Sequence, residues 1–178
     1  MLAPLRHAAL ALVVCLLSPA LAWADDLRFL TLNIQLDAHD GKQVPAMIAL
    51  IRKTQADIVG LQESDRATRA IAEGLGFQWV KQDDDRGIIS RYPLTLTPGR
   101  QGARVSLPDG RSLMFYNLHP YYRPYQPYQL LRIPYCDDPF LTTAAQAIDA
   151  ARAARGRDVT AALADIARVT DPGTPTVV

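Results

Sequence analysis

The chain has 178 residues, with 19 lysines and arginines, 18 aspartates and glutamates, and a formal net charge of +1. This length suits one domain with a hydrophobic core. The balanced charge excludes the broad basic surface of a non-specific nucleic-acid binder, although it leaves room for a local basic cleft.

Residues 1–24 have the pattern of a secretory signal peptide. A basic start precedes the apolar run Ala8–Leu17, small residues follow, and cleavage is expected after Ala24. The apolar run is too short for a membrane span, so we expect no stable membrane anchor. We therefore predict a secreted or periplasmic protein whose folded domain is residues 25–178. Loss of Arg6 with the signal leaves 18 basic residues against 18 acidic ones.

The chain has two cysteines, and one of them, Cys15, lies within the expected signal peptide. Cys136 is then the only thiol of the mature chain, which excludes a framework of disulfides. We expect this lone thiol to be buried rather than reactive.

The first half of the chain predicts a strand–helix–strand unit. Apolar residues at positions 44, 47, 48 and 51 have the spacing of one helix face, and they lie between two apolar runs of strand length. A short helix and a third strand follow. The expected elements are a strand at Leu27–Ile34, a helix that includes Val44–Ile51, a strand at Ile58–Gln62, a helix from Ser64 or Asp65 to Leu75, and a strand that begins at Phe77–Val80.

The second half predicts a hairpin, a loop and one long helix. Pro108-Asp109-Gly110 is a strong turn signal between two extended segments, and the acidic run Asp83–Asp85 is typical of a solvated turn. Strands mixed with helices in this order favour an α/β layered sandwich of mixed sheets. The expected elements are extended segments at Gly87–Arg91 and Gly102–His119, a loop at Pro120–Pro139, a helix at Thr142–Val169 with Val159, Ala162, Leu163 and Ile166 on one face, and a strand that begins at Thr174–Val178.

Asn33 and Glu63 stand at the ends of the two strands of the first unit. If these strands are parallel, an amide oxygen and a carboxylate meet at one edge of the sheet. Mg²⁺ takes oxygen ligands, usually with one or two carboxylates from the protein and with water or substrate phosphate in the remaining positions. Taken alone, such residues more often have turn or helix-cap roles.

Four segments give the pair its context: Thr31–Ile34, Val59–Glu63, Ile88–Leu94 and Tyr116–His119. In this order and at these spacings they resemble the endonuclease/exonuclease/phosphatase superfamily, which includes deoxyribonucleases, apurinic-site endonucleases, sphingomyelinases and inositol-phosphate phosphatases. The resemblance covers essentially the whole mature chain. It implies the layered α/β fold of that superfamily and a metal-dependent phosphoesterase with Mg²⁺ or Mn²⁺ as cofactor.

The resemblance also implies roles for three residues. Glu63 would be the principal carboxylate that binds the metal, and Asn33 would position the metal or the phosphate beside it. His119 would donate a hydrogen bond or a proton toward the phosphate or the leaving oxygen, a task that suits an imidazole because its ordinary pKa lies near neutrality. Without the other motifs, His119 would be interpreted as a strand-end histidine bonded to backbone.

Several other polar residues are weaker candidates. Arg91 could contact phosphate, although its segment more often forms a packed strand end. Asp37, His39 and Asp40 follow the first strand and are interpreted as a flexible connection. Asn117 is assigned to strand packing.

The loop after His119 holds four tyrosines within eight residues. Tyrosine offers a flat apolar face with a polar tip and proline stiffens a chain, so the loop could form a wall for a ring-bearing substrate or a lipid head group. A self-packed surface loop is the alternative. Stacking on bases has little support, because only one arginine lies in the cluster. The candidate substrate-binding residues are Tyr121, Tyr122, Arg123 and Tyr125, together with Arg91.

The sequence departs from the superfamily pattern toward its end. The Gly-Asp-x-Asn and Ser-Asp-His segments of the superfamily do not occur, and Thr174–Val178 is similar to the strand that leads into the first of them. The resemblance assigns the activation of water to those segments. We therefore expect this to be the N-terminal portion of the domain, with the second half of the sandwich incomplete. The chain would be either part of a longer enzyme, which we favour, or a short inactive product.

The leading prediction is an exported metal-dependent phosphoesterase that hydrolyses a phosphodiester or a phosphomonoester by in-line attack of water. The alternative is a non-catalytic exported protein that keeps the scaffold and binds a ligand with the tyrosine- and proline-rich loop. A serine hydrolase is set aside because no Gly-x-Ser-x-Gly segment occurs. Nucleic acid, phospholipid head groups and sugar phosphates stay open as substrates, and no protein partner is implied.

Overall fold

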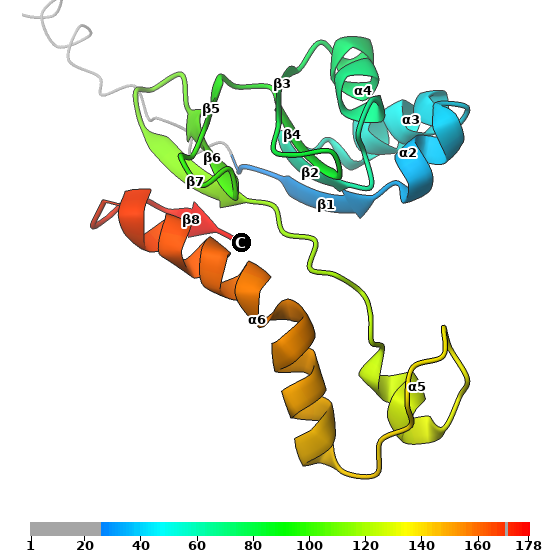
Figure 1. Cartoon of the computed structure of the whole chain (residues 1–178). Helices are drawn as coiled ribbons and strands as arrows, with labels where there is room; N and C mark the ends of the chain where they lie inside the picture. The colour runs from blue at the N-terminus through cyan, green and yellow to red at the C-terminus, as the bar shows by residue number, and fades with distance from the viewer. Residues whose placement is uncertain (1–25, 170) are drawn as a thin grey trace, which may run out of the picture.

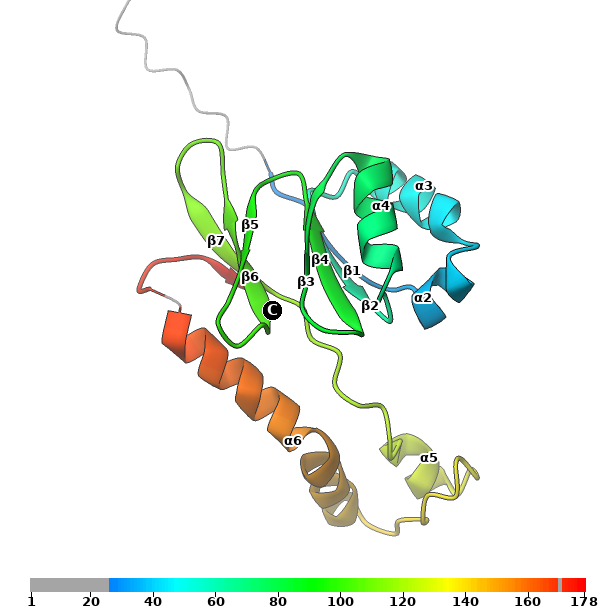
Figure 2. The same cartoon turned by 45° about the horizontal axis from the view of Figure 1, so that its top comes forward.

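Two mixed β-sheets lie face to face, with helices on the outer side of each (Figures 1 and 2). The computed structural model describes residues 26–169 and 171–178, and the expected signal peptide with Cys15 lies outside them. The layers confirm the predicted α/β sandwich. Among the described residues, no helix has the length and apolar character that a membrane crossing requires.

The predicted strand–helix–strand unit forms one edge of the first sheet. β1 (Phe29–Asn33) runs parallel to β2 (Ile58–Gln62). The helices α2 (Gln35–Asp40) and α3 (Val44–Thr54) connect the two strands. Because both strands run in the same direction, the polar residues that end them come to the same edge of the sheet.

The rest of the first sheet is antiparallel. β4 (Arg86–Ser90) pairs with β2, and β3 (Gln78–Lys81) pairs with β4 at the far edge. Between β2 and β3 the chain forms α4 (Ala67–Leu75), which ends as predicted at Gly76. The φ of Gly76 is 72°, in the left-handed region that glycine adopts without strain.

The N-terminus of α4 is capped from another segment of the chain. The Asp37 carboxylate accepts a hydrogen bond from the backbone N–H of Ala67 at 2.6 Å. The expected local cap by Ser64 or Asp65 is replaced, and the Asp65 carboxylate instead lies 2.5 Å from the Lys81 ammonium. The contact also corrects the interpretation of Asp37 as part of a flexible connection, because it fixes that segment to α4.

The second sheet has the strand order β5–β6–β7–β8. β6 (Gly102–Ser106) and β7 (Ser112–Tyr116) form the predicted hairpin, and Gly110 in its turn has a φ of 84°. β5 (Leu94–Leu96) pairs antiparallel with β6, and β8 (Thr176–Val177) pairs parallel with β7. The sequence does not predict β5, because a strand of three residues is too short to show a period.

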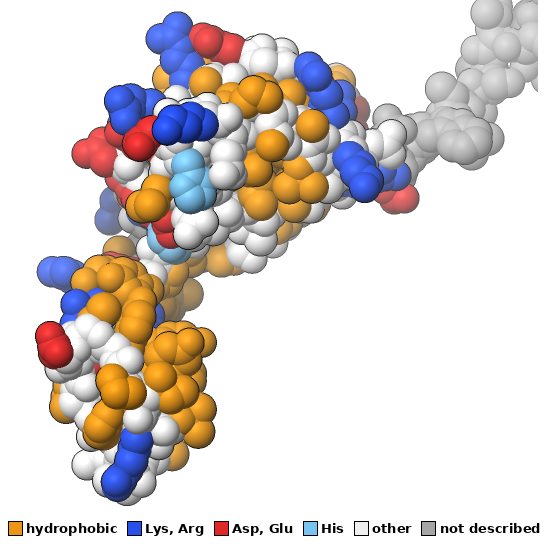
Figure 3. All heavy atoms as spheres, turned by 90° about the vertical axis from the view of Figure 1, so that its right-hand side faces the viewer, with side chains coloured by type: hydrophobic (Ala, Val, Ile, Leu, Met, Phe, Trp, Pro, Cys, Tyr) orange, Lys and Arg blue, Asp and Glu red, His pale blue; other side chains and the backbone are white. Residues whose placement is uncertain are grey.

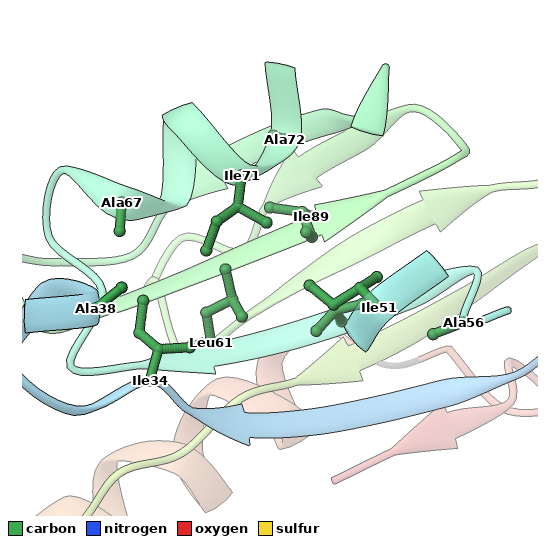
Figure 4. Close-up of a cluster of buried hydrophobic side chains, with 10 residues drawn as sticks. Ile34, Ala38, Ile51, Ala56, Leu61, Ala67, Ile71, Ala72 and Ile89 are labelled. Atoms are coloured by element: carbon green, nitrogen blue, oxygen red, sulfur yellow. The ribbon is translucent and has the colours of Figure 1, made fainter. Parts of the chain in front are cut away.

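A hydrophobic core lies between the first sheet and the helices α3 and α4 (Figure 4). Ile51 of α3 and Ile71 of α4 pack against Leu61 and Ile89 of the sheet, and all four side chains are buried. Burial of one side chain of this size stabilises the fold by about 1.5–3 kcal/mol. This packing explains the apolar helical spacing between residues 44 and 51.

A second hydrophobic core fills the space between the two sheets. Ile58 and Ile88 of the first sheet face Val105 and Phe115 of the second. β2 therefore contacts a core on each of its faces, and all of its residues are buried. This explains why its sequence is a continuous apolar run rather than an alternation of apolar and polar residues.

Buried amides continue this core toward the ends of the strands. The side chain of Asn117 donates hydrogen bonds to Leu61 O and to Gln82 Oε1, each at 2.9 Å, and accepts one from Gln62. Gln82 Nε2 in turn donates to Asn117 O at 3.1 Å. The assignment of Asn117 to strand packing is confirmed. The network fixes the chain two residues before His119.

The C-terminal half of α6 (Ala144–Val169) lies against the second sheet (Figure 1). The buried Asp165 carboxylate accepts hydrogen bonds from the backbone N–H groups of Gly99 at 2.9 Å and Gln101 at 3.2 Å, and from the hydroxyl of Thr97. These residues form the turn between β5 and β6. One buried carboxylate therefore connects the long helix to the sheet.

Only part of the predicted apolar face of α6 is buried. Val159 and Leu163 are 46% and 60% exposed, whereas Ala162 and Asp165 are buried. The helical period correctly indicates a helix, but the polar contact of Asp165 decides which side of it faces the sheet.

The N-terminal half of α6 and the segment before it, including α5 (Gln126–Leu131), extend away from the sheets as an arm (Figure 1). Apolar side chains gather over the lower lobe that this arm forms in Figure 3. The sequence predicts a loop in place of α5, although Pro127 near its start is typical of a helix N-terminus. The prediction that Cys136 is buried is wrong, because its loop lies on the arm, away from both cores. Exposed apolar residues of the arm include Tyr125, Leu130, Leu131, Ile133 and Phe140.

Candidate functional site

The parallel register of β1 and β2 brings Asn33 and Glu63 together, as the sequence predicts. Asn33 pairs with Gln62 in the sheet, so Glu63 follows directly at the same edge. Asn33 Nδ2 donates a hydrogen bond to Glu63 Oε1 at 2.8 Å, and Asn33 Oδ1 accepts one from the backbone N–H of Gln35 at 2.9 Å. The amide of Asn33 is therefore fixed, and it orients the carboxylate of Glu63.

Glu63 is held in its ionised form. The hydrogen bond from Asn33 and a second one, from the backbone N–H of Leu36 to Oε2 at 2.9 Å, lower the pKa of Glu63 below its ordinary value, and His119 lowers it further. Partial burial opposes them without reversing the direction. At neutral pH the side chain is thus a carboxylate, the form in which it binds a cation.

The backbone on both sides of this contact is strained. Residues Gln35–Asp40 all have φ values between 47° and 57°, and Glu63 has a φ of 54°. This left-handed region is unfavourable for residues other than glycine by about 1–2 kcal/mol each. The backbone N–H of Asp37 donates to Glu63 O at 2.7 Å, so the two strained segments support each other. Strain of this kind is concentrated at functional sites in proteins.

His119 joins the pair from the chain that follows β7. Its Nε2 lies 3.4 Å from Asn33 Nδ2 and 4.0 Å from Glu63 Oε1. On the other side of the ring, Nδ1 lies 2.6 Å from Asp85 Oδ2. A proton on Nδ1 donated to this carboxylate fixes the ring, so that Nε2 faces Glu63.

Asp85 is a site residue that the sequence does not reveal. The run Asp83–Asp85 is typical of a solvated turn, and no pattern in it shows which carboxylate turns toward another strand. The available signal is weak: an acidic turn immediately before a predicted strand can place a carboxylate at the edge of the sheet. Only the pairing of the strands puts it beside His119.

The acidic turn is rigid. Asp83 accepts hydrogen bonds from the backbone N–H of Asp85 at 2.9 Å and from the Arg86 guanidinium at 2.6 Å. Burial by itself would raise the pKa of Asp83, but these donors hold it below its ordinary value. Arg86 also donates to Asn117 O at 3.2 Å, and the backbone N–H of Ser64 donates to Asp85 O at 3.0 Å. The turn is therefore connected to the segments that carry Glu63 and His119.

These side chains open into a pocket of about 610 Å³ between the sheet edge and α6. The polar part of its lining contains Glu63, Asp85 and His119. Tyr121 and Tyr122, from the predicted substrate loop, line the same pocket. The remaining lining residues are Leu36, Asp83, Arg86, Gln101, Leu118, Pro120, Asp158, Val159 and Ala161.

The other predicted substrate residues lie elsewhere. Arg91 contacts Asp57 at 3.0 Å, and Asp57 precedes β2, so Arg91 lies at the end of that strand opposite to Glu63. Arg123 is paired with Asp138 at 3.0 Å within the arm.

Tyr125 packs edge-to-face on Tyr128 of α5, with ring centroids 4.8 Å apart, and it does not line the pocket. The structure thus brings Tyr121 and Tyr122 to the site, and leaves the two arginines and this tyrosine outside it.

The oxygen atoms of the site suit a cation that keeps most of its bound water molecules. Among residues 26–169 and 171–178, no three His, Cys, Asp or Glu side chains converge as a ready-made cage for a metal. Mg²⁺ needs less than a cage, since one or two carboxylates with water and phosphate complete its shell. The ionised Glu63 in an open pocket provides such a carboxylate. The side-chain oxygen of Asn33 already accepts a hydrogen bond from the backbone N–H of Gln35, and in this structure Asn33 orients the carboxylate of Glu63. Direct contact between Asn33 and a metal stays a prediction.

No family model and no curated protein matches the chain. Several solved structures are similar to it, and three of them are as follows. An endonuclease/exonuclease/phosphatase family protein from Leptotrichia buccalis C-1013-b has 13% identity and a TM-score of 0.39, with 53% of each chain covered. A humanised TDP2 of D. rerio has 15% identity and a TM-score of 0.42, over 60% of this chain and 53% of its own. An AP endonuclease from Archaeoglobus fulgidus has 12% identity and a TM-score of 0.37, over 60% of this chain and 48% of its own.

The chain spans about half the length of each of these structures. At identities of 12–15% and TM-scores below 0.5, the function has to be argued from the residues of this chain.

Proposed function

We propose that the pocket is the metal-holding part of an exported phosphoesterase that hydrolyses a phosphate ester by in-line attack of water. The observation that carries this proposal is the convergence of an oriented, ionised carboxylate and a carboxylate-bound imidazole in one pocket. Glu63 Oε1 and His119 Nε2 lie 4.0 Å apart, and the second ring nitrogen of His119 contacts Asp85. Export is inferred from the signal pattern of residues 1–24.

Each residue has a distinct task in this proposal. Glu63 holds the cation, and Asn33 keeps the carboxylate in position. Mg²⁺ or Mn²⁺, when bound, offsets the negative charge of the phosphate. His119 donates from Nε2 to the phosphate or to the leaving oxygen, and Asp85 is a positioning residue that fixes the ring through Nδ1.

Among the described residues, His119 is the one imidazole that lines the pocket. We propose that His119 donates a proton to the leaving oxygen. None of the described side chains is assigned to the activation of water. The described residues are therefore expected to bind metal and phosphate and to support only slow hydrolysis.

Binding provides the direct test. Mn²⁺ is titrated into the full chain and followed by electron paramagnetic resonance, and inorganic phosphate is then added. One Mn²⁺ is expected to bind and to strengthen the binding of phosphate. Glu63→Gln should abolish both effects, whereas His119→Ala should retain Mn²⁺ and weaken phosphate.

The matched control is Glu73→Gln, because Glu73 is an exposed glutamate of α4 that pairs with Arg69 outside the pocket. Mn²⁺ binding that is equally strong in Glu63→Gln and Glu73→Gln would overturn the proposed site.

A non-catalytic exported binding protein is the second candidate. It is favoured by the half-exposed Tyr121 and Tyr122, which line the same pocket as Glu63. It predicts that phosphate binds equally with and without Mn²⁺ and that bis(p-nitrophenyl) phosphate is not hydrolysed. Hydrolysis that depends on Mn²⁺ and on His119 would exclude it.

A further inference from the structure

Five tyrosine rings of the arm form one continuous aromatic surface. The ring of Tyr122 contacts that of Tyr121, with centroids 5.1 Å apart, and that of Tyr135, at 6.4 Å. The ring of Tyr128 contacts Tyr135 edge-on at 5.6 Å and Tyr125 edge-on at 4.8 Å. All five residues are between 37% and 56% exposed. The exposed rings are therefore gathered in one place rather than scattered over the surface.

Aliphatic side chains of α5 and of the residue after its C-cap extend this surface. Leu130, Leu131 and Ile133 are all exposed, and Leu131 is the most exposed of them at 70%. Together with the five tyrosines they form what we name the arm patch. In Figure 3 apolar side chains gather over the lobe that carries the arm patch, and in Figure 1 this lobe stands away from both sheets. The arm patch belongs to neither hydrophobic core.

Polar contacts fix the chain that carries the arm patch. The Arg123 guanidinium pairs with the Asp138 carboxylate at 3.0 Å. From α6, the Arg155 guanidinium donates to Tyr121 O at 3.1 Å and to the side chain of Gln126. The rings are thus held in position before a partner binds, which reduces the entropy that is lost on association.

The composition of this region is typical of a protein interface. Residues 120–143 contain six aromatic residues, two arginines and two aspartates, but neither lysine nor glutamate. Protein interfaces are enriched in tyrosine and arginine and depleted in lysine and glutamate. A helical segment that lies on a membrane instead has a polar face rich in lysine and arginine. The formal charge of residues 120–143 is zero, which disfavours an anionic lipid surface as the partner.

The area of the arm patch is sufficient for a stable contact. Because one aromatic side chain buries about 150–250 Å², the exposed parts of the five tyrosines offer on the order of 450 Å². One partner of a standard protein interface buries about 800 Å². The rings therefore supply about half of that area before the aliphatic side chains are counted.

Two charged residues that adjoin the arm patch are complementary to each other. Arg132 lies between Leu131 and Ile133 in the chain, and Asp137 lies two residues after Tyr135. Both side chains are exposed, and within the described part of the chain neither forms an ion pair or a side-chain hydrogen bond. In a contact with twofold symmetry the same surface meets itself, so Arg132 of each copy can face Asp137 of the other.

We propose that the arm patch is the interface of a symmetric dimer, in which its rings pack against those of a second copy and Arg132 of each copy pairs with Asp137 of the other. A second copy is the favoured occupant because one surface then supplies the apolar area and both signs of charge. The proposal is independent of the phosphoesterase function, because neither charged residue lines the pocket around Glu63.

Sedimentation equilibrium of the full chain tests the proposal. The buffer contains a reductant, so that a disulfide through the exposed Cys136 does not imitate the dimer. A monomer–dimer equilibrium is expected. Leu131→Ser, which alters an exposed side chain, should weaken dimerisation about tenfold. Arg132→Asp and Asp137→Arg should each weaken it about 100-fold, because like charges would then meet twice across the interface.

Mixing the two charge variants separates contacts between copies from contacts within one copy. Each variant alone should be monomeric, whereas an equimolar mixture of Arg132→Asp and Asp137→Arg should form a heterodimer about as tightly as the wild type dimerises, because opposite charges meet again at both positions. The matched control is Arg69→Asp, because Arg69 is an exposed arginine of α4 outside the arm. It should dimerise like the wild type.

Several results would overturn the proposal. These are a wild-type chain that stays monomeric, a mixture of the two charge variants that stays monomeric, and equal effects of Arg132→Asp and Arg69→Asp. Binding of a monomeric wild-type chain to phosphatidylcholine vesicles, with loss of that binding in Leu131→Ser, would overturn it in favour of a lipid surface. Glu63→Gln should dimerise like the wild type while it loses Mn²⁺, so the dimer and the metal site fail separately.

Discussion

Replacing Gly60 by alanine tests the rigidity of the buried amides that hold the end of β7. Gly60 lies in β2, and a Cβ atom there would stand 2.7 Å from Oδ1 and 2.8 Å from Cγ of Asn117. Non-bonded carbon atoms in proteins approach to about 3.5 Å. The side chain of Asn117 must therefore move by several tenths of an ångström.

Asn117 cannot move without losing partners. Its Nδ2 lies 2.9 Å from Leu61 O, 2.9 Å from Gln82 Oε1 and 3.1 Å from Gly87 O, and its Oδ1 accepts from Gln62. A buried hydrogen bond contributes a net value of about 1 kcal/mol. If three of these bonds are lost, the free energy of unfolding falls by about 3 kcal/mol.

A double-mutant cycle identifies the cause of this loss. Asn117→Ala alone removes the same hydrogen bonds and is expected to be destabilising by about 3 kcal/mol. In that background Oδ1 and Cγ are gone, and only Cβ of residue 117 faces the alanine at position 60, at 3.1 Å, so Gly60→Ala should cost clearly less free energy of unfolding than it does in the wild type. Urea unfolding of all four proteins, followed by circular dichroism, gives the values. Equal effects of Gly60→Ala in both backgrounds would refute the explanation.

Three further perturbations test the site and the helix contact. Asp85→Asn should slow metal-dependent hydrolysis about 10- to 100-fold and leave Mn²⁺ affinity unchanged, because the Asp85 carboxylate positions His119 and does not contact Glu63. A loss of Mn²⁺ affinity in this variant would contradict that role. Since the pKa of Glu63 is lower in the folded state than its ordinary 4.5, ionised Glu63 stabilises the fold fully above that pH, and the contribution disappears as pH falls through the lower folded value. The stability difference between wild type and Glu63→Gln, measured by urea unfolding, should therefore shrink on acidification, and a difference that grows would be inconsistent with the lowered pKa. Asp165→Asn should lower the free energy of unfolding by about 2 kcal/mol, because an amide nitrogen would face donors that now bind a carboxylate; calorimetry showing an unchanged melting temperature would argue against that contact.

The strands of the first sheet could be predicted because buried strands have a recognisable run of apolar residues in the sequence. Ile58–Gln62 is buried on both faces, and its continuous apolar run shows this directly. The apolar spacing of α3 reflects a single core-facing side, and the Pro-Asp-Gly turn defines the β6–β7 hairpin. In each case the packing partner is a generic apolar surface, so the pattern of the chain alone is sufficient.

Asp85, Cys136 and the buried side of α6 could not be predicted, because each depends on a partner distant in the sequence. Asp85 contacts His119, which lies 34 residues further along the chain. Asp165 faces the sheet because three donors of the β5–β6 turn meet its carboxylate, and hydropathy gives no sign of this. Cys136 is exposed because the arm leaves the sheets, a property of the chain path rather than of residue type.

The sequence by itself determined the layered α/β class, the strand ends that carry Asn33 and Glu63, and the histidine that completes the visible centre. The class and the strand ends follow from local periodicity, whereas the role of the histidine follows from the resemblance of the four sequence segments to the superfamily. Tertiary structure alone decided which groups meet: the Asp85 carboxylate beside His119, and the two tyrosines that line the same pocket as Glu63. Such contacts depend on strand register and on the path of α6, and no short segment of the sequence determines either of these.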